Sequence, residues 1–451
     1  MKSKTYMPLL ILIIQLLLFA TSCKQTTEPK LEAELKLELE DVSCTEAWIK
    51  LTTTNLQLPA TVNLLRDGTK AQTINLLVAD TVLYVDSLLP NQTYKFQASI
   101  QPFNHSGLPA EGRHSSNELT VTTMDTTSHN FTWQSWEFGQ HSSSTLYDVA
   151  IIDENNIWAV GEIYMLDSLG RPDPNAYNAV HWDGTKWELK RIYTYSNCSS
   201  IDYAPLRSIY AFASNKIVVT SGGGMWWFDG NRWIAECSIN PLLTGAINKL
   251  WGSSSEDLYA VGNNGNIAHW DGVRWRKIES GTTLNINDIW GDYNSAESDY
   301  EIIFIAAQQF VGPERNIYRI VDKSVEKLST LNINQGSIHG IWFKTGRKYY
   351  VVGNGIYTTN NVNYGSFWDA SLINLTPYYT YAIRGSALNN VLICGSFGEL
   401  LHYNGFTWQS FQNMLGFFNA DFFNIDVKEN VTAVVGQKFN SGIIVIGKTG
   451  L

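Results

Sequence analysis

A short motif recurs four times along the chain and restricts the folds that the chain can adopt. An aromatic residue, then Asp or Asn, then Gly is followed three residues after the Gly by Trp. The copies are HWDGTKW from His181, FDGNRW from Phe228, HWDGVRW from His269 and HYNGFTW from His402. Each copy predicts a β-hairpin, because Gly tolerates the positive φ of a tight turn and the flanking aromatic residues form a cross-strand pair. Hairpins repeated at roughly 40–50 residues predict the blades of a β-propeller.

A second pattern lies upstream of the hairpins and sets the expected number of blades. Seven segments align without gaps: YDVAIID from Tyr147, RSIYAFA from Arg207, NKLWGSS from Asn248, NDIWGDY from Asn287, HGIWFKT from His339, YAIRGSA from Tyr381 and FNIDVKE from Phe423. Their third residue is always aliphatic: Val149, Ile209, Leu250, Ile289, Ile341, Ile383 and Ile425.

A small-residue turn follows these segments in six of the seven units, at Gly161, Gly222, Gly262, Gly353, Gly395 and Gly436. The fourth unit departs from this pattern, with Ala306 and Ala307 before Gln308. We therefore expect an all-β chain whose residues 131–451 form a seven-bladed propeller.

The last unit ends one strand short, and the missing strand is found before the first unit. FTWQSWEF at Phe131–Phe138 repeats the outer strand of the sixth unit, FTWQSF at Phe406–Phe411. We expect Phe131–Phe138 to pair with the three C-terminal strands and close the ring, which removes the exposed sheet edges of an open stack.

The N-terminus has the pattern of an export signal. Lys2 and Lys4 precede an apolar run from Met7 to Ala20, which is short for a membrane span and typical of a signal peptide. The sequence Ala20-Thr21-Ser22-Cys23 resembles a bacterial lipobox, although Ala20 stands where Leu is most usual. The resemblance implies a signal peptide over residues 1–22, lipidation of Cys23, a tether over residues 23–30, and a bacterial outer-membrane or cell-surface location. The alternative is an ordinary signal peptide with an incidental Cys.

Composition and cysteines narrow the function classes. Charged residues make up 16% of the chain and aromatic residues 13%, and the formal net charge is −10, so a nucleic-acid binder is excluded. Cys44 and Cys394 lie in apolar strand patterns and are expected to be buried thiols. Cys198 and Cys237 follow outer strands of neighbouring units, so a bridge between them and two separate thiols both stay open. No metal-binding spacing of cysteines occurs.

Residues 31–124 contain short alternating strands and resemble a fibronectin type III domain. Trp48 occupies a strand B position, Arg66-Asp67-Gly68 forms a turn after strand C, and Leu89-Pro90 before Thr93-Tyr94 resembles the tyrosine corner. The whole arrangement resembles exported bacterial lipoproteins that join such a module to a propeller, a class sometimes named glycosyl hydrolase. Modules of this kind are spacers or adhesion units, so no chemistry follows from the resemblance.

Catalysis and metal binding are poorly supported by the sequence. The hairpins differ from the Asp-box of sialidases, since Asp and Gly are adjacent, and Asp183, Asp229 and Asp271 are interpreted as turn residues. Glycoside hydrolysis needs two positioned carboxyl groups, but no motif connects the candidates, which are Asp148, Asp288, Asp292, Arg207 and Arg384. His181, His269 and His402 lie on non-adjacent blades and cannot converge on one ion, so we expect no metal and no cofactor.

Aromatic residues in predicted loops on one face of the propeller give the strongest functional signal. We name as binding candidates Tyr193, Tyr195, Tyr203, Arg207, Tyr378, Tyr379, Tyr381, Phe418 and Phe422, beside Phe417 and Phe423. Exposed rings suit stacking on sugars or anchoring a protein partner. The alternative is that these rings pack inward and fill the mouth of the ring. We expect a non-catalytic, membrane-anchored protein that binds a glycan or a protein partner; a carbohydrate-active hydrolase and a purely structural envelope component are the alternatives.

One ion pair is predicted from the inner strands. The fourth residues of the seven aligned segments are Ala150, Tyr210, Trp251, Trp290, Trp342, Arg384 and Asp426. Two opposite charges on adjacent blades stand among apolar and aromatic residues, where an unpaired charge is costly. The sequence therefore predicts a pair between Arg384 and Asp426, which either fastens the last blade or meets a polar ligand.

Overall fold

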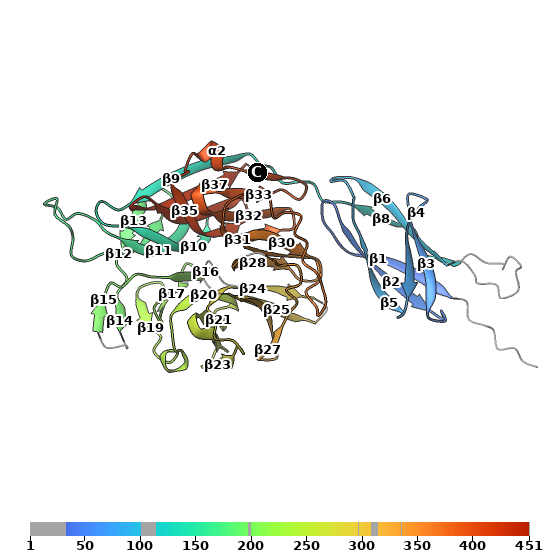
Figure 1. The fold of residues 1–451 in the computed structure, drawn as a ribbon, viewed down its shortest axis with the longest axis horizontal. Coiled ribbons are helices and arrows are strands. Elements are labelled where there is room, and N and C mark those ends of the chain that lie inside the picture. Colours follow the sequence, from blue (N-terminus) through green and yellow to red (C-terminus); the bar gives the residue numbers. More distant parts are fainter. Residues whose placement is uncertain are drawn as a thin grey trace, which may run out of the picture. The chain divides into compact units, whose positions relative to one another are not determined.

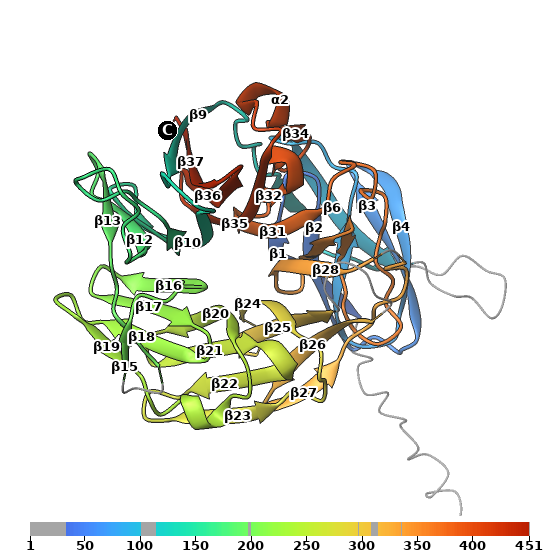
Figure 2. The same cartoon turned by 60° about the vertical axis from the view of Figure 1, so that its left-hand side comes forward.

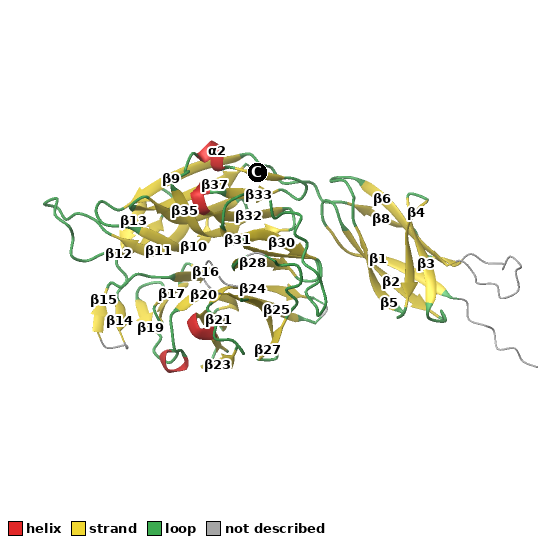
Figure 3. Cartoon of the chain, in the orientation of Figure 1, coloured by secondary structure: helices red, strands yellow, loops and turns green. Residues whose placement is uncertain are grey.

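The computed structural model describes residues 33–100, 114–196, 200–295, 297–307, 314–334 and 336–450. Regular structure in these ranges is almost entirely β-strand, as Figure 3 shows. The helical turns are η1 (Asn240–Leu242), η2 (Asn263–Gly265), η3 (Ser396–Gly398) and α2 (Gln412–Leu415). The expected all-β class is confirmed. The chain divides into two compact units, Met1–Thr123 and Met124–Leu451.

Unit 1 is built from two antiparallel sheets with a shared core (Figure 1). One sheet has the order β1 (Glu34–Val42), β2 (Ala47–Thr54) and β5 (Asp80–Val85). The other has the order β4 (Thr69–Leu76), β3 (Ala60–Arg66), β6 (Thr93–Ile100) and β7 (His114–Ser115), and β8 (Leu119–Thr122) also pairs with β6. Alternate side chains of both sheets enter one cluster, which includes Leu37, Ile49, Leu51, Leu64 and Phe96.

Local features of unit 1 agree with the patterns read from the sequence. The hydroxyl oxygen of Tyr94 accepts a hydrogen bond from the Leu89 N–H at 2.9 Å, which is the contact of a tyrosine corner. Asp67 and Gly68 have φ values of 50° and 76° between β3 and β4, as a two-residue hairpin turn requires. Trp48 is buried in β2. The fibronectin type III assignment itself stays a prediction.

Unit 2 contains, among the described residues, seven sheets of three or four strands, which we number as blades one to seven in chain order. In Figure 2 their first strands surround the centre of a ring. Blades one to three are β10 (Thr145–Asp153), β11 (Asn156–Ile163), β12 (Tyr177–Trp182) and β13 (Trp187–Lys190); β16 (Ser208–Ala213), β17 (Lys216–Ser221), β18 (Gly224–Phe228) and β19 (Trp233–Ala235); and β20 (Ile247–Ser254), β21 (Asp257–Gly262), β22 (Asn266–Trp270) and β23 (Trp275–Glu279).

The remaining blades follow the same order from the inner to the outer strand. They are β24 (Ile286–Asn294), β25 (Asp299–Ala307), β26 (Arg315–Val321) and β27 (Ser324–Lys327); β28 (Ile338–Lys344), β29 (Lys348–Gly353) and β30 (Gly355–Thr359); β31 (Thr380–Ala387), β32 (Asn390–Gly395), β33 (Leu400–Tyr403) and β34 (Trp408–Ser410); and β35 (Ala420–Lys428), β36 (Val431–Lys438), β37 (Ser441–Thr449) and β9 (Phe131–Phe138). A two-stranded hairpin, β14 (Thr194–Ser196) and β15 (Ser200–Asp202), lies between blades one and two.

The four predicted hairpins are present, each closed by a cross-strand aromatic pair. The pairs are Trp182 with Trp187, Phe228 with Trp233, Trp270 with Trp275 and Tyr403 with Trp408. In the first hairpin the Asp183 carboxylate accepts hydrogen bonds from the Thr185 and Lys186 N–H groups at 2.9 Å. Together with the Thr185 hydroxyl, these bonds lower the pKa of Asp183 to about 2. The turn therefore occupies this carboxylate.

The recurring glycines at the ends of second strands have a steric cause. A bulge interrupts the inner strand of six blades at this level, and it brings a carbonyl oxygen against the facing residue. A Cβ on Gly161 would lie 2.0 Å from the Thr145 oxygen. Ala306 takes this position in blade four, paired with Ile286. Gly222 differs, because it lies in the next turn with φ of 52°.

The ring is closed by an N-terminal strand. β9 pairs antiparallel with β37, from Phe131 opposite Thr449 to Phe138 opposite Gly442, so the two ends of unit 2 share one sheet. The ring of Trp133 packs against Phe411 of blade six at 5.1 Å.

The cysteines are placed as follows. Cys44 and Cys394 are buried, and burial raises the pKa of the Cys394 thiol to about 12. Cys237 is disulfide-bonded. Cys198, the partner that we considered for it, lies outside the described residues, as does Cys23.

The linker that enters β9 is held against blade six. The Thr127 N–H donates to the Asn404 carbonyl at 3.1 Å, and the Asn389 side-chain amide donates to the Asp125 carbonyl at 3.0 Å. Next to them, Nδ1 of His129 lies 2.9 Å from Nδ1 of His402.

The hydrogen bonds of this histidine pair fix its tautomers. Nε2 of His402 lies 3.1 Å from the Asn390 side-chain oxygen, so it donates there and its Nδ1 accepts. Nδ1 of His129 must then donate to His402, which leaves Nε2 of His129 without a proton, 3.0 Å from the Thr407 hydroxyl oxygen. No carboxylate of the described residues hydrogen-bonds to either ring. Burial lowers the pKa of His129, and it lowers that of His402 from 6.5 to about 3.

We predict that this pair makes unit 2 less stable in acid. Because both histidines have a lower pKa in the folded state than in the unfolded state, their contribution is complete above pH 6.5 and is lost as the pH falls toward 3. Between pH 7.5 and 4.5 the melting temperature of the wild type should therefore fall about 5 °C further than that of a His129→Gln/His402→Gln variant. Calorimetry at both pH values measures this difference, and His141→Gln is the control, which should behave as wild type. Equal shifts in all three proteins would contradict the prediction.

Candidate binding face of the propeller

The first residues of the seven aligned segments form a ring on one face of unit 2. This face, which we call the loop face, carries the loops that lead from each outer strand to the next inner strand. The ring, which we call the mouth ring, consists of Tyr147, Arg207, Asn248, Asn287, His339, Tyr381 and Phe423. The amides of Asn248 and Asn287 donate to the carbonyls of Ile286 and Ile338 on the following blade, at 3.0 and 3.1 Å. The mouth ring is thus tied from blade to blade.

Aromatic side chains fill the mouth ring at blades five to seven. The ring of Tyr381 lies 5.5 Å from His339, 5.1 Å from Tyr379 and 5.4 Å from Phe423. All four side chains are partly exposed. Burial raises the pKa of Tyr379 to about 12 and also raises that of Tyr381, so both phenols are neutral hydrogen-bonding groups. We call these four residues the aromatic arc.

Two further predicted rings lie at blades six and seven. Tyr378 packs against Phe397 at 5.2 Å, and Phe397 is 55% exposed with φ of 58°, a left-handed conformation that bulky residues rarely adopt. Phe418 is 50% exposed. Phe422 was expected among the exposed rings, and this expectation is wrong because Phe422 is fully buried in the core between blades six and seven. Phe423, the extra residue of the bulge in β35, is partly exposed.

The candidates at blades one and two form a separate group. Tyr193 is 51% exposed and packs against Tyr203 at 4.8 Å. Tyr195 lies in β14, but its side chain is not among those described. The guanidinium of Arg207 is exposed and stacks 4.1 Å above the ring of Tyr147.

The Glu162 carboxylate holds the Tyr147 ring of this stacked pair in place through a hydrogen bond. The hydroxyls of Tyr147 and Tyr164 donate to the two oxygens of Glu162, at 2.5 and 2.9 Å. Burial, together with Glu162, raises the pKa of Tyr147 to about 12. Tyr147 is therefore held as a neutral phenol, and the Glu162 carboxylate is already occupied.

Four acids of the inner strands connect neighbouring blades: the catalytic candidates Asp148, Asp288 and Asp292, together with Asp426. Asp148 accepts from the Ile209 N–H at 3.0 Å, and Asp288 accepts from the Ile341 N–H at 3.0 Å. Asp292 accepts from the Thr345 N–H at 2.9 Å, and Asp426 accepts from the Ile151 N–H at 2.7 Å. In each case the donor is one position further along the aligned inner strand of the next blade. We call these four contacts the carboxylate clamps.

Two buried ion pairs cross the central channel beside these clamps. Lys249 Nζ lies 2.8 Å from Asp148, and the Arg384 guanidinium donates to both oxygens of Asp288, at 2.7 and 2.9 Å. Burial alone would raise the pKa of Asp288, but the charge of Arg384 and its hydrogen bonds hold that pKa below its usual range.

The partner of Arg384 therefore differs from the one that we predicted. The charged partner is Asp288 on blade four, not Asp426 on the adjacent blade seven. The carboxylate of Asp426 is turned toward the Ile151 and Val427 N–H groups, and burial raises its pKa. Asp426 and Arg384 both line a cavity of about 170 Å³ in the channel.

The repeated hairpin histidines have a packing role in common. Each bonds to the first residue of its blade's second strand: His181 to Asn156, His269 to Asp257 and His402 to Asn390, at 3.0, 2.7 and 3.1 Å. Over the described ranges, no group of three or more His, Cys, Asp and Glu residues is arranged to hold a metal ion.

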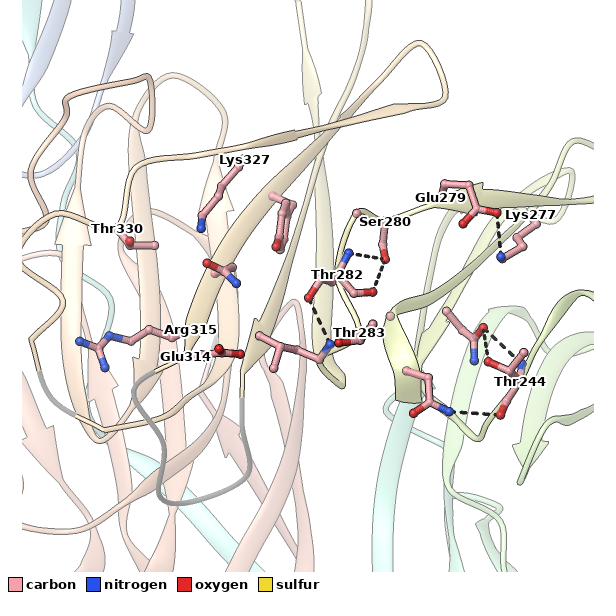
Figure 4. A pocket seen from close by; sticks show the side chains of 17 residues that line it. Thr244, Lys277, Glu279, Ser280, Thr282, Thr283, Glu314, Arg315, Lys327 and Thr330 are labelled. Carbon is pink, nitrogen blue, oxygen red and sulfur yellow. Dashed lines mark hydrogen bonds and ion pairs between the residues drawn. The ribbon is translucent and has the colours of Figure 1, made fainter.

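A larger cleft, which sequence reasoning missed, lies between blades three and four on the loop face (Figure 4). Its volume is about 840 Å³. It is lined by η2, by residues 280–284 and by the facing residues of β26 and β27, including Glu314, Arg315 and Lys327. We call it the blade 3–4 cleft. Its residues come from six short segments, so no single motif marks it in the sequence.

These features define a β-propeller. Among solved structures, the chain is similar to YCF48 bound to D1 peptide, with 18% identity over 70% of this chain and 95% of that chain, and a TM-score of 0.52. It is also similar to YCF48 from Cyanidioschyzon merolae, with 14% identity over 70% of this chain and 98% of that chain, and a TM-score of 0.50. These similarities show the propeller fold. No protein family matches the chain, and no curated protein matches it.

Helices of membrane-spanning length and apolarity do not occur in the described part of the chain.

We predict that Arg384 and Asp288 are energetically coupled. Removing one charge leaves the other buried without its partner, at a cost of about 3–5 kcal/mol. The changes Arg384→Met and Asp288→Asn should therefore each destabilise the protein, and the double variant should be more stable than the sum of the single losses implies by about 2 kcal/mol. Denaturant unfolding of the four proteins gives this coupling energy. The matched cycle of Arg384→Met with Asp426→Asn should give a smaller one; the reverse order would show that Asp426 is the true partner.

Proposed function

We propose that this protein is a non-catalytic binding protein of the bacterial cell envelope, whose propeller holds a protein partner at the loop face. The aromatic arc is the observation that carries the proposal. Partly exposed rings that already pack against one another lose little conformational freedom on binding, and such rings are the residues on which binding energy concentrates. Arg207, stacked on Tyr147, adds a pre-oriented guanidinium for a carboxylate or a carbonyl group of the partner.

The similar solved structures support a protein partner over other ligands. One of them is YCF48 in complex with D1 peptide, so a propeller of this fold can hold a polypeptide segment. A peptide offers both apolar side chains for the aromatic arc and polar groups for Arg207. The partner that we propose for this chain is a segment of another polypeptide.

The carboxylates of the propeller favour binding over hydrolysis. Glycoside hydrolysis needs one carboxyl group as acid and another as base or nucleophile. Asp148, Asp288, Asp292 and Asp426 each accept a backbone N–H bond from the next blade, so removing any of them from its clamp would weaken the ring. The carbohydrate-active hydrolase therefore remains the alternative with less support.

The domain scheme is part of the same proposal. Residues 31–124 would be a fibronectin type III spacer, supported by the Tyr94 corner and by the three-stranded sheet that faces a larger one. Residues 131–451 would be a seven-bladed propeller, supported by the strand order of its sheets and by the pairing of β9 with β37.

Binding at the aromatic arc is tested with peptides selected on the purified protein from a random display library. Tyr381→Ala and Phe423→Ala should each weaken the selected peptides at least about tenfold by fluorescence anisotropy, because about 1.4 kcal/mol of contact energy is lost. Tyr293→Ala is the matched control, since Tyr293 is an exposed aromatic residue near the other end of an inner strand. Unchanged affinity in both arc variants would refute the site, and turnover of a glycan by the wild type would favour the hydrolase.

The membrane anchor is tested separately at Cys23. The motivation is the apolar run that ends in Ala20-Thr21-Ser22-Cys23, and acyl chains on that Cys would give a stable anchor. In bacteria fed a clickable fatty acid, the wild type should carry the label and fractionate with the envelope. Cys23→Ser should lose the label and be soluble or unprocessed. Equal labelling of both proteins would contradict lipidation at this residue.

A further inference from the structure

The blade 3–4 cleft has the size of a ligand site but an unusual lining. Its volume of about 840 Å³ falls in the range of small-molecule sites, which are mostly lined by apolar and aromatic side chains. Here the lining is instead dominated by hydroxyls, amides and a few charges. The one aromatic residue, Tyr318, is only 7% exposed and offers no ring face for stacking.

Several polar side chains in this cleft have no partner within the described part of the chain. Glu314, Asn316, Lys327 and Thr330 lie in or beside the outer strands of blade four, and Thr283 lies in the segment that leads to its inner strand. Glu314 and Lys327 are exposed, and Asn316 is partly exposed. Together they offer a carboxylate acceptor, an ammonium donor, an amide and two hydroxyls. Figure 4 shows Glu314, Lys327 and Thr330 on the side of the cleft opposite Glu279 and Lys277.

The other charged groups around the cleft are already satisfied. Lys277 and Glu279 form an ion pair at 2.7 Å. The Arg315 guanidinium donates to the carbonyls of Ile333 and Gly336, at 2.8 and 3.1 Å. These carbonyls are neutral, so Arg315 keeps its positive charge, and the lining carries three basic and two acidic groups. One excess positive charge makes the cleft neither a polyanion site nor a polycation site.

We propose that the blade 3–4 cleft binds a neutral polyhydroxylated ligand, with the chemistry of an oligosaccharide segment. Sugar hydroxyls both donate and accept, so they match a mixture of amide, hydroxyl, carboxylate and ammonium groups. The Glu314 carboxylate accepts from a pair of vicinal hydroxyls, while Lys327 and Asn316 donate to sugar oxygens. An apolar peptide side chain would find no matching surface in this lining. The site is separate from the mouth ring, so it stands or falls independently of the protein-binding function.

The test uses the purified full-length chain and four neutral hexasaccharides: maltohexaose, cellohexaose, mannohexaose and chitohexaose. Saturation-transfer NMR detects binding, and calorimetric titration measures the affinity of each sugar that binds. We expect at least one sugar to bind, with affinity reduced at least tenfold in Lys327→Met and in Asn316→Leu. Lys216→Met, an exposed lysine change in β17 on blade two, is the matched control and should keep the wild-type affinity.

The outcomes separate this site from the others. Because Lys327 is exposed, Lys327→Met should melt at the wild-type temperature, which removes misfolding as an explanation of lost binding. Absence of binding by all four sugars would overturn the proposal. So would binding that Lys327→Met and Asn316→Leu leave unchanged, or binding that Tyr381→Ala abolishes, because the ligand would then sit elsewhere. Displacement of the sugar by the display-selected peptides would also overturn it, since the cleft would then be part of the peptide site.

Discussion

Side-chain hydrogen bonds connect the inner strands of neighbouring blades in unit 2. Among the described residues, each blade completes its ladder within one sheet and neighbouring blades share no strand pairing, although single backbone bonds such as that from the Ile247 N–H to the Gly222 carbonyl cross between blades. The inner strands therefore come together without mutual backbone hydrogen bonds. The carboxylate clamps supply this connection at four places, and the clamps of Asp148 and Asp288 satisfy buried N–H groups that would otherwise be costly. Packing of aliphatic residues such as Ile289 and Ile341 fills the space between the clamps.

This constraint also explains how charge is distributed in the channel. Three buried acids require compensation, and Lys249 and Arg384 supply it for Asp148 and Asp288. Asp426 receives backbone N–H bonds instead. The mouth ring lies above this charged layer, tied by side-chain to carbonyl bonds such as that of Asn287. The face that we propose for binding thus rests on side chains held by hydrogen bonds, and groups that are already oriented lose little freedom on binding.

Much of the fold follows from local sequence patterns, while contacts between blades do not. The hairpins were predictable because Gly184 and the aromatic residues beside it act within a few residues of each other. The closing strand was predictable from the repeated FTWQS, and its pairing with β37 matches that expectation. Phe422 and Phe423 show the limit of a loop-based argument, since both lie within strand β35 and only Phe423, at its bulge, is partly exposed. Arg384 shows another limit, because its partner Asp288 lies two blades away. The order of the blades in the sequence does not reveal which side chains meet across the central channel.

The route by which the chain enters the ring determines how unit 2 bears tension from its N-terminal side. β9 runs antiparallel to β37, with Phe131 at its N-terminal end opposite Thr449. A force that pulls this end away from β37 would break the residue pairs between the two strands one after another. Sequential breakage needs less force than breaking all the pairs at once. The linker contacts of Thr127 and His129 with blade six come before Phe131 along the chain. The force therefore acts on these contacts first, and the pairing of β9 with β37 stays intact until the contacts of Thr127 and His129 with blade six are broken.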